Sequence, residues 1–347
     1  MNNCFCVLPW YSQELGLKNS PCCLLPHNHN INQIKQDLLS GVQTAACKKC
    51  WDIEATGNKS RRQFENEFLD YKLNRDLDKI QQDCVDSKHQ TLLYQITTSN
   101  LCNQACVSCD SGASTKWAQV EKRMNIISAP QYQFNLDSAN INYNSAKRIS
   151  LLGGEPLFDP KTFRILQNLI DHNNTSCFIS LITNGSIHLN AKQTNLLTQF
   201  TNLNICISID GVGPVFEYMR WPGKWSNLLE NIEQYKFITK NISVSYTISS
   251  LNAMYYNQTV NWFQQNNLVY NHNVVSGPIW LSLSQMPIKL KQHLKQQDNF
   301  ITMHCNLTGT EISLETLTQN IIKQDHAKNM NIRDYMPEVA AVIFDTV

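Results

Sequence analysis

From about residue 90 to residue 285, short apolar runs alternate with stretches of helical periodicity. Six runs have the length and composition of strands: 92–96, 149–152, 178–182, 203–209, 242–248, and either 268–275 or 279–283. Helical patterns separate them, one beginning near Ser114 and others covering 163–170, 225–237 and 255–263. Strands that alternate with helices predict βαβ units, an α/β fold and a parallel sheet. Six such units favour a barrel or part of one, with its chemistry at the carboxyl ends of the strands.

The 347 residues are enough for two domains, or for one large domain with an appendage. We expect a small cysteine-rich module with a helical linker over residues 1–75, a partial barrel over 88–285 and a helical extension over 286–347. Within the first part the pattern predicts helices over 31–39 and 54–75, and the segment 128–144 has the composition of a polar loop.

The charge of the chain excludes some classes of partner. There are 29 basic and 28 acidic residues, a net charge of +1, which argues against a large nucleic acid or an anionic membrane surface as partner. No apolar run approaches the length of a membrane-spanning helix, and residues 1–13 do not have a basic region followed by an apolar one. We therefore expect a cytoplasmic protein that does not bind membranes.

The thirteen cysteines are unevenly distributed. Most fall into two groups, one over residues 4–50 and one over 102–109. Because a reducing compartment disfavours disulfides, such groups favour metal binding or redox chemistry, and the two groups predict two metal centres. Cys177 and Cys206 lie within apolar runs and are expected in the core. Cys84 and Cys305 lie in polar surroundings and are expected to be surface thiols.

The second group has the spacing C-x3-C-x2-C and consists of Cys102, Cys106 and Cys109, directly after the first expected strand. Three thiolates within eight residues can bind one face of an iron–sulfur cluster and leave one iron without a protein ligand. A zinc site is the alternative, but zinc usually requires a fourth Cys or His, and none follows soon in the sequence.

With these residues the chain resembles the radical SAM superfamily, whose signature is C-x3-C-x2-C in the loop after the first barrel strand. The resemblance covers roughly residues 88–285. Two further elements occur in the family's order: Gly153-Gly154-Glu155-Pro156 closes the second strand, and Ser208-Ile-Asp210-Gly211 closes the fourth, with Arg220 beyond it. Thr183-Asn184-Gly185 matches a common strand-end motif, although Asn184-Gly185 is also an ordinary turn sequence.

The resemblance implies a [4Fe–4S] cluster on the three cysteines and S-adenosylmethionine (SAM) bound to its open iron. The residues it implies for SAM are Gly153, Gly154, Glu155, Pro156, Ser208, Asp210 and Arg220. Glycine lets backbone come close to a ligand, and a guanidinium fits a carboxylate. Many relatives carry an aromatic residue before the last cysteine to pack on adenine. This chain has Ser108 there, so other residues must provide that packing.

The first fifty residues resemble an auxiliary-cluster module of the Twitch or SPASM type, here placed before the barrel as in Twitch-containing radical SAM proteins of phages and bacteria. The resemblance implies an auxiliary [4Fe–4S] cluster. Its expected ligands are Cys6, Cys22, Cys47 and Cys50. Cys23 is the alternative to Cys22, since neighbouring residues of a strand point to opposite faces. A structural zinc remains an alternative because four thiolates also suit that ion.

The implied activity is reductive cleavage of SAM to methionine and a 5′-deoxyadenosyl radical, followed by hydrogen abstraction from a substrate. The substrate is expected to be a peptide or protein side chain, with a small metabolite or nucleotide as the alternative. The electron donor is expected to be a protein such as flavodoxin or ferredoxin. A non-enzymatic iron–sulfur or zinc binding protein is the remaining class. No residue of the sequence stands out as a hydrogen donor or catalytic base.

Overall fold

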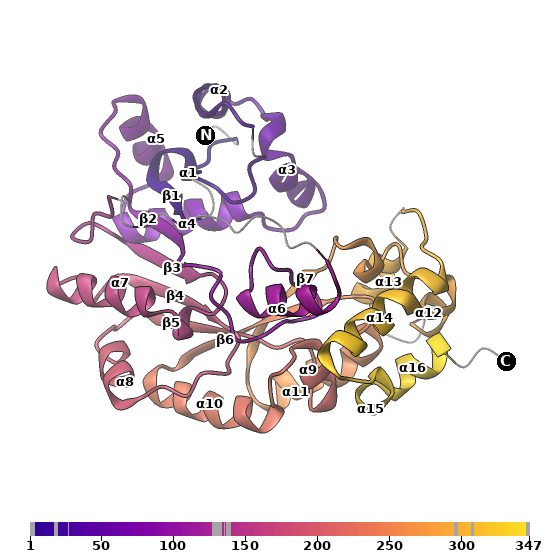
Figure 1. The fold of residues 1–347 in the computed structure, drawn as a ribbon. Coiled ribbons are helices and arrows are strands. Elements are labelled where there is room, and N and C mark those ends of the chain that lie inside the picture. The colour runs from indigo at the N-terminus through magenta and orange to yellow at the C-terminus, as the bar shows by residue number, and fades with distance from the viewer. Residues whose placement is uncertain are drawn as a thin grey trace.

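The fold is built on one sheet of seven strands, all parallel and hydrogen-bonded in chain order (Figure 1). The structure is a computed structural model and describes residues 4–16, 20–26, 28–126, 134, 136, 140–294, 298–306 and 309–344. The strands are β1 (Ser12–Leu15), β2 (Leu93–Thr97), β3 (Arg148–Leu152), β4 (Phe178–Thr183), β5 (Leu203–Ser208), β6 (Asn241–Ile248) and β7 (Val269–Val274). This order, in which each strand pairs with the next, is that of a partial α/β barrel.

Helices precede, connect and follow the strands. The N-terminal part contains α1 (Leu8–Tyr11), α2 (Ile31–Leu39), α3 (Lys48–Ala55), α4 (Arg61–Leu73) and α5 (Leu77–Val85). The barrel contains α6 (Thr115–Arg123), α7 (Pro160–Asp171), α8 (Ala191–Leu197), α9 (Pro214–Met219), α10 (Trp225–Ile238) and α11 (Tyr256–Gln265). The C-terminal part contains α12 (Ile288–His293), α13 (Asn299–Cys305), α14 (Leu314–Lys328), α15 (Ile332–Tyr335) and α16 (Pro337–Phe344).

The two faces of the sheet differ in polarity. Along β3 to β6 every second side chain is buried in the core against the helices; examples are Ile149, Leu181, Ile205 and Val244. Because successive residues of a strand point to opposite faces, the remaining side chains form the other face. That face is partly exposed and carries Ser150, Ser180, Asn204, Cys206, Ser243 and Ser245. A closed barrel packs this inner face with branched apolar side chains, whereas here it is mostly polar, with Leu152, Phe178 and Ile182 as apolar members.

The sequence predicted the α/β class, and the six expected strands correspond to β2–β7. Of the two candidates for the last strand, residues 269–274 form β7, and Ile279–Leu281 form a 3₁₀ turn. The sequence analysis missed the seventh strand, β1, which pairs in parallel with β2 at the edge of the sheet. It has only four residues, Ser-Gln-Glu-Leu, and so gives no apolar run to detect.

The helices expected over 31–39 and 54–75 correspond to α2 and α4, and α4 begins later, at Arg61, because Ser60 caps it. Most of the expected polar loop, 128–144, lies outside the described residues. In the part of the chain that the structure describes, no helix is long and apolar enough to span a bilayer.

Helix α4 joins the N-terminal part to the polar face of the sheet. Glu65 of α4 accepts a hydrogen bond of 2.5 Å from Arg148 of β3 and lies 3.6 Å from Arg61. One turn further, the ring of Phe68 packs edge-on against Phe178 of β4 with 5.8 Å between centroids. Because the Glu65 side chain is only 9% exposed, its carboxylate neutralises two guanidinium groups in a poorly hydrated place.

Removing this carboxylate is expected to destabilise the fold. Glu65→Ala leaves Arg148 and Arg61 without their shared acidic partner, and we expect the free energy of unfolding to fall by about 3 kcal/mol. Glu67→Ala on the same helix removes a solvent-exposed ion pair with Lys59 and is expected to cost less than about 1 kcal/mol. Urea unfolding followed by circular dichroism measures both. Equal losses in the two variants contradict the role assigned to Glu65.

Candidate active site and the cysteine-lined cavity

The loop that carries Cys102, Cys106 and Cys109 connects β2 to α6 at the carboxyl edge of the sheet and contains no helix or strand. Neighbouring segments hold its backbone. The amide of Ala105 donates to Trp221 O at 2.7 Å, and the amide of Val107 donates to Met219 O at 2.8 Å. The indole Nε1 of Trp117 donates to Cys106 O at 2.6 Å. The loop is therefore fixed from α6 on one side and from the segment after β5 on the other.

The three thiols lie close enough to influence one another. Burial raises the pKa of Cys106 to about 11, and the neighbouring Cys102 raises it further while Arg220 opposes the shift. Burial, Cys106 and Cys102 all raise the pKa of Cys109. A metal centre binds thiolates, so these thiols must lose their protons when it binds. Three partly buried sulfur atoms whose negative charges repel one another suit a positively charged group placed between them.

The two glycines after β3 lie against the segment that leads into the cysteine loop. The amide of Gly154 donates to Ser99 O at 2.8 Å. A Cβ on Gly153 would lie 2.6 Å from Ser99 O, and one on Gly154 would lie 2.6 Å from Leu101 O. Gly153 also has φ +150°, a conformation that side-chain-bearing residues rarely adopt. Only glycine permits this close approach.

A buried hydroxyl lies beside the first glycine. The Oγ1 of Thr98, a residue only 1% exposed, has no hydrogen-bond partner among the described residues. It lies 3.2 Å from the position of a Cβ on Gly153. A buried polar atom without a partner costs free energy unless a ligand or water satisfies it. The residues around Gly153 therefore fit a group that offers a hydrogen-bonding atom at this point.

Glu155 follows the glycines and is fully buried. Its carboxylate accepts hydrogen bonds from the Thr183 hydroxyl at 2.8 Å and from the amides of Asn184 at 2.6 Å and Leu157 at 2.9 Å. Burial raises the pKa of Glu155 to about 7, against the opposing effect of these donors. Its side chain therefore connects the ends of β3 and β4 within the protein, and Pro156 after it is buried at the start of a 3₁₀ turn.

Asn184 lies nearer to the cysteines than its turn sequence suggested. Its Nδ2 donates to Asn103 Oδ1 at 2.9 Å and lies 3.9 Å from the Cys102 sulfur. The carboxylate of Glu155 holds its backbone, so the ends of β3 and β4 and the cysteine loop form one connected network. The strand-end motif was visible in the sequence, but a turn explained it equally well.

Arg220 is buried beside Cys106. Its guanidinium Nη1 lies 3.7 Å from the Cys106 sulfur, and its Nε lies 2.9 Å from Asp210 Oδ2 in an ion pair. Asp210 is fully buried and also accepts from the amide of Thr247 at 2.9 Å. Ser208, at the end of β5, is partly exposed on the polar face of the sheet. Among the residues after β5 that are expected to contact SAM, Arg220 thus lies at the cysteine loop and is held there by its ion pair with Asp210.

A polar cavity of about 150 Å³ adjoins the cysteine loop. Asn103 and Gln104 of the loop line it, together with Gly185, Ser186 and the segment 222–228. Gln104 is 1% exposed, and its Nε2 has no hydrogen-bond partner among the described residues. This cavity is open to a polar ligand or to water beside the three thiols.

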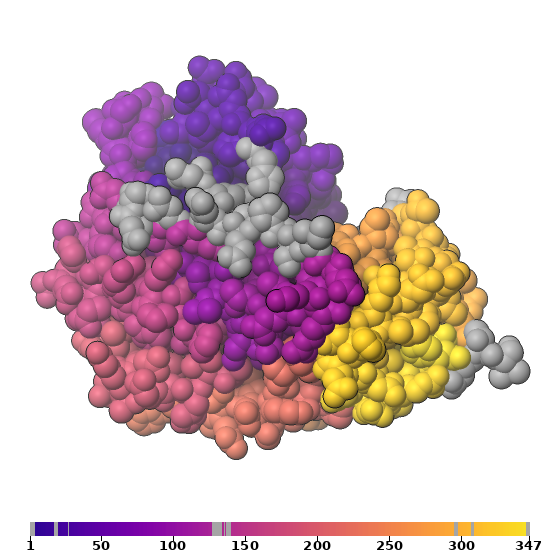
Figure 2. Space-filling view, viewed as in Figure 1, coloured from indigo at the N-terminus to yellow at the C-terminus, as the bar shows by residue number. Residues whose placement is uncertain are grey.

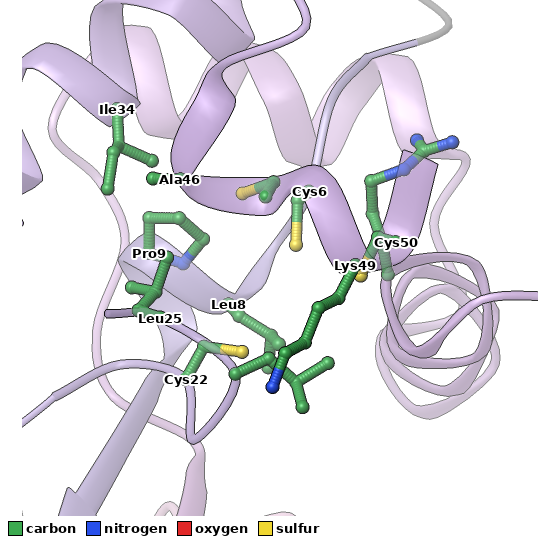
Figure 3. A pocket seen from close by; sticks show the side chains of 12 residues that line it. Cys6, Leu8, Pro9, Cys22, Leu25, Ile34, Ala46, Lys49 and Cys50 are labelled. Atoms are coloured by element: carbon green, nitrogen blue, oxygen red, sulfur yellow. The ribbon is translucent and has the colours of Figure 1, made fainter. Parts of the chain in front are cut away.

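In the N-terminal part, four cysteines line a second cavity (Figure 3). They are Cys6, Cys22, Cys47 and Cys50, and the sulfur atoms of Cys6 and Cys22 point into the same space. Burial raises the pKa of Cys6 well above its usual range, and Cys22, Cys47 and Cys50 each raise it further. Burial also raises the pKa of Cys22 to about 11 and that of Cys47 to about 12. The sequence placed these four residues on one centre, and the fold brings them together.

Cys22 and Cys23 differ in environment. Cys22 lines the cavity, whereas the sulfur of Cys23 accepts a hydrogen bond of 2.6 Å from Arg61 Nη1. The same guanidinium donates to Gln95 of β2 at 3.0 Å. Cys23 therefore contacts the helix that covers the sheet.

Among the described residues, no group of three or more His, Cys, Asp or Glu is arranged to hold a single metal ion as the side chains stand. In a four-iron cluster each thiolate binds its own iron, so the sulfur atoms lie further apart than around one ion. The fit of both cysteine groups to a cluster thus rests on their burial and electrostatic coupling.

Three of the four single cysteines differ from expectation. Cys206 was expected in the core but is partly exposed on the polar face, because it occupies the outward register position of β5. Cys84 and Cys305 were expected at the surface but are buried, since the polar residues around them lie on the opposite sides of α5 and α13. Cys177 is buried as predicted.

No family model and no curated protein matches the chain. Among solved structures, native anSMEcpe with bound AdoMet is 16% identical, with 69% of this chain and 62% of that chain covered and a TM-score of 0.40. Streptococcus suis SuiB bound to S-adenosylmethionine is 12% identical, with 74% and 50% covered and a TM-score of 0.40. SuiB bound to the precursor peptide SuiA is 10% identical, with 88% and 65% covered and a TM-score of 0.40. The chain thus spans less than two thirds of the length of each.

The approach of the second glycine to the cysteine loop gives a testable prediction. Gly154→Ala places a Cβ within 2.7 Å of backbone atoms of Asn100 and Leu101, which cannot move without shifting the loop. We expect the free energy of unfolding to fall by about 1–3 kcal/mol and the iron retained after anaerobic reconstitution to fall with it. Gly277→Ala, which has open space around the new Cβ, is the matched control and should leave both unchanged. Full iron content in Gly154→Ala contradicts the close approach.

Proposed function

We propose that this protein is a radical SAM enzyme. The observation that carries the proposal is the group of three partly buried, electrostatically coupled thiols at the carboxyl edge of a parallel sheet, next to a close backbone approach that only the glycine pair permits. Cys102, Cys106 and Cys109 would hold a [4Fe–4S] cluster, which would supply the electron for the cleavage of SAM to methionine and a 5′-deoxyadenosyl radical. The cysteine spacing and the order of the strand-end motifs support the same assignment.

The residues of this chain position and enclose the reacting groups. Gly153 and Gly154 let the backbone after β3 pack against Ser99 and Leu101, and the unpartnered hydroxyl of Thr98 beside them offers an amino acid moiety a hydrogen bond. Glu155 holds the ends of β3 and β4 in place. Arg220, oriented by Asp210, places a positive charge beside Cys106, where it favours the thiolate and suits a carboxylate. In this proposal Ser208 contacts SAM from the partly exposed face of the sheet.

We assign an auxiliary [4Fe–4S] cluster to the four-cysteine cavity. Four thiolates complete the ligands of such a cluster, which suits it to electron transfer. The position of Cys22 in the cavity wall, with Cys23 bonded to Arg61 instead, supports Cys22 as the ligand. The proposal also includes an external one-electron donor, such as flavodoxin or ferredoxin, that reduces the protein.

The substrate we propose is a peptide or protein segment bound over the polar face of the sheet. That face presents hydroxyl and amide groups at Ser150, Ser180, Asn204, Ser245 and Asn271, which can both donate and accept hydrogen bonds as a peptide backbone requires. Its charged Arg148 is already neutralised by Glu65. A small polar metabolite is the alternative occupant.

The proposed reaction predicts release of 5′-deoxyadenosine. Protein reconstituted without oxygen, given a reductant and SAM, should form the nucleoside, and mass spectrometry measures it. Cys102→Ala removes one of the three thiolates and should reduce the product to the level without protein, whereas Cys305→Ala, in the C-terminal part, should retain it. Transfer of deuterium from labelled peptides into the nucleoside then identifies the substrate. Absence of product from a preparation that retains its iron contradicts the proposal.

The auxiliary site predicts a specific metal content. Wild-type protein should hold roughly eight irons per chain, and Cys47→Ser roughly four, because one of two four-iron clusters is lost. Cys23→Ser is the matched control and should hold as much iron as the wild type, since the Cys23 sulfur accepts a hydrogen bond from Arg61. Plasma emission spectrometry measures iron and zinc together. If the wild type contains zinc and Cys47→Ser loses that zinc with its iron unchanged, the four cysteines form a structural zinc site and not a cluster site.

A further inference from the structure

Helix α14 places a buried lysine against the elements that hold the cysteine loop. Lys328, at the end of α14, is 4% exposed. Its ammonium lies 4.5 Å from the centroid of the Trp117 ring, and the indole of Trp117 donates to Cys106 O. Arg123 of α6 donates to Ala327 O at 3.0 Å, so α14 and α6 are held together at this point. In the space-filling view the C-terminal segment lies against the segment that follows the cysteine loop (Figure 2).

The charge of Lys328 is not cancelled by a carboxylate. Its Nζ donates to the neutral amide of Gln324 at 2.8 Å, and within the described residues no Asp or Glu lies at ion-pair distance from it. The nearest acidic influence is Asp325, whose two oxygens accept from the Tyr218 hydroxyl and the amide of Ile332, both at 2.8 Å. This differs from Arg220, whose positive charge is paired with Asp210.

The lysine interacts with the cysteine loop through its charge. Burial lowers the pKa of Lys328 to about 8, while Cys106, Asp325 and Cys109 oppose the shift because their negative forms favour the ammonium. In the other direction, Lys328 lowers the pKa of Cys106. In a poorly hydrated place such a charge acts over a longer range than it does in water.

We propose that Lys328 is a positioning residue whose ammonium group stabilises the reduced state of the cluster on the cysteine loop and so raises its reduction potential. The inference rests on the proposed function, since it requires a cluster at Cys102, Cys106 and Cys109. One added electron makes the cluster more negative, and a nearby buried cation interacts more favourably with the more negative state. The C-x3-C-x2-C motif does not specify this charge, because the lysine lies on helix α14, more than two hundred positions later in the chain.

A potential titration followed by electron paramagnetic resonance tests the proposal. Lys328→Met keeps the length and removes the charge, Lys328→Arg keeps the charge, and Lys323→Met removes an exposed lysine from the same helix. The signal that changes on addition of SAM identifies the cluster of the cysteine loop, and the other cluster serves as an internal control. We expect the reduced-to-oxidised ratio at the wild-type midpoint to fall about tenfold in Lys328→Met, equivalent to about 59 mV for one electron.

Lys328→Arg and Lys323→Met should titrate close to the wild type. An unchanged midpoint in Lys328→Met overturns the inference, and an equal fall in Lys328→Arg does so too, because shape and not charge would then be responsible. If Lys328→Met fails to fold, Lys328→Gln makes the same comparison. These outcomes are separate from failure of the proposed function, in which the wild-type protein itself shows no signal that responds to SAM.

Discussion

The cysteine loop depends on backbone hydrogen bonds supplied by its neighbours. It has no helix or strand of its own, and the amides of Gly154 and Glu155 donate to Ser99 O and Leu101 O just before it. These bonds require the backbone after β3 to lie closer than any side chain allows. The parallel order of the strands makes this contact possible, since it brings the carboxyl ends of β2 and β3 to the same edge. The position of the cysteine loop therefore depends both on the order of the strands and on the glycine pair after β3.

The thiols of both cysteine groups are buried or partly buried, and the surrounding charges affect how readily they lose their protons. Each group of cysteines raises the pKa of its own members, which disfavours the thiolates that a metal centre needs. Nearby cations therefore favour the thiolate form of the cysteines at both sites. Arg62 lines the N-terminal cavity but forms an ion pair with Glu54, and Arg220 is paired with Asp210. Lys328 differs from both in having a neutral partner, and it adds to the larger effect of Arg220 in opposing the rise in the pKa of Cys106.

The sequence predicted local features well and long-range ones poorly. Apolar periodicity located six strands because a buried face leaves a repeating pattern. It missed β1, whose four residues have little apolar character, and it misplaced Cys206, since an apolar run does not say which face a residue takes. The resemblance to an auxiliary-cluster module grouped Cys6, Cys22, Cys47 and Cys50. It gave no indication of Lys328 or of the Asn184 contact with Cys102, because both depend on how distant segments pack.

The pairing of β1 with β2 has a consequence for how such a protein is assembled. Glu14 and Gln95, 81 positions apart, are joined by a side-chain hydrogen bond across this pair. Without β1, the backbone of β2 becomes a free edge with Leu93, Tyr94 and Ile96 along it, and such an edge pairs readily with other chains. The N-terminal part thus supplies the edge strand of the partial barrel. A barrel separated from it would expose this edge and is expected to aggregate, so the sheet depends on a strand from the cysteine-rich part.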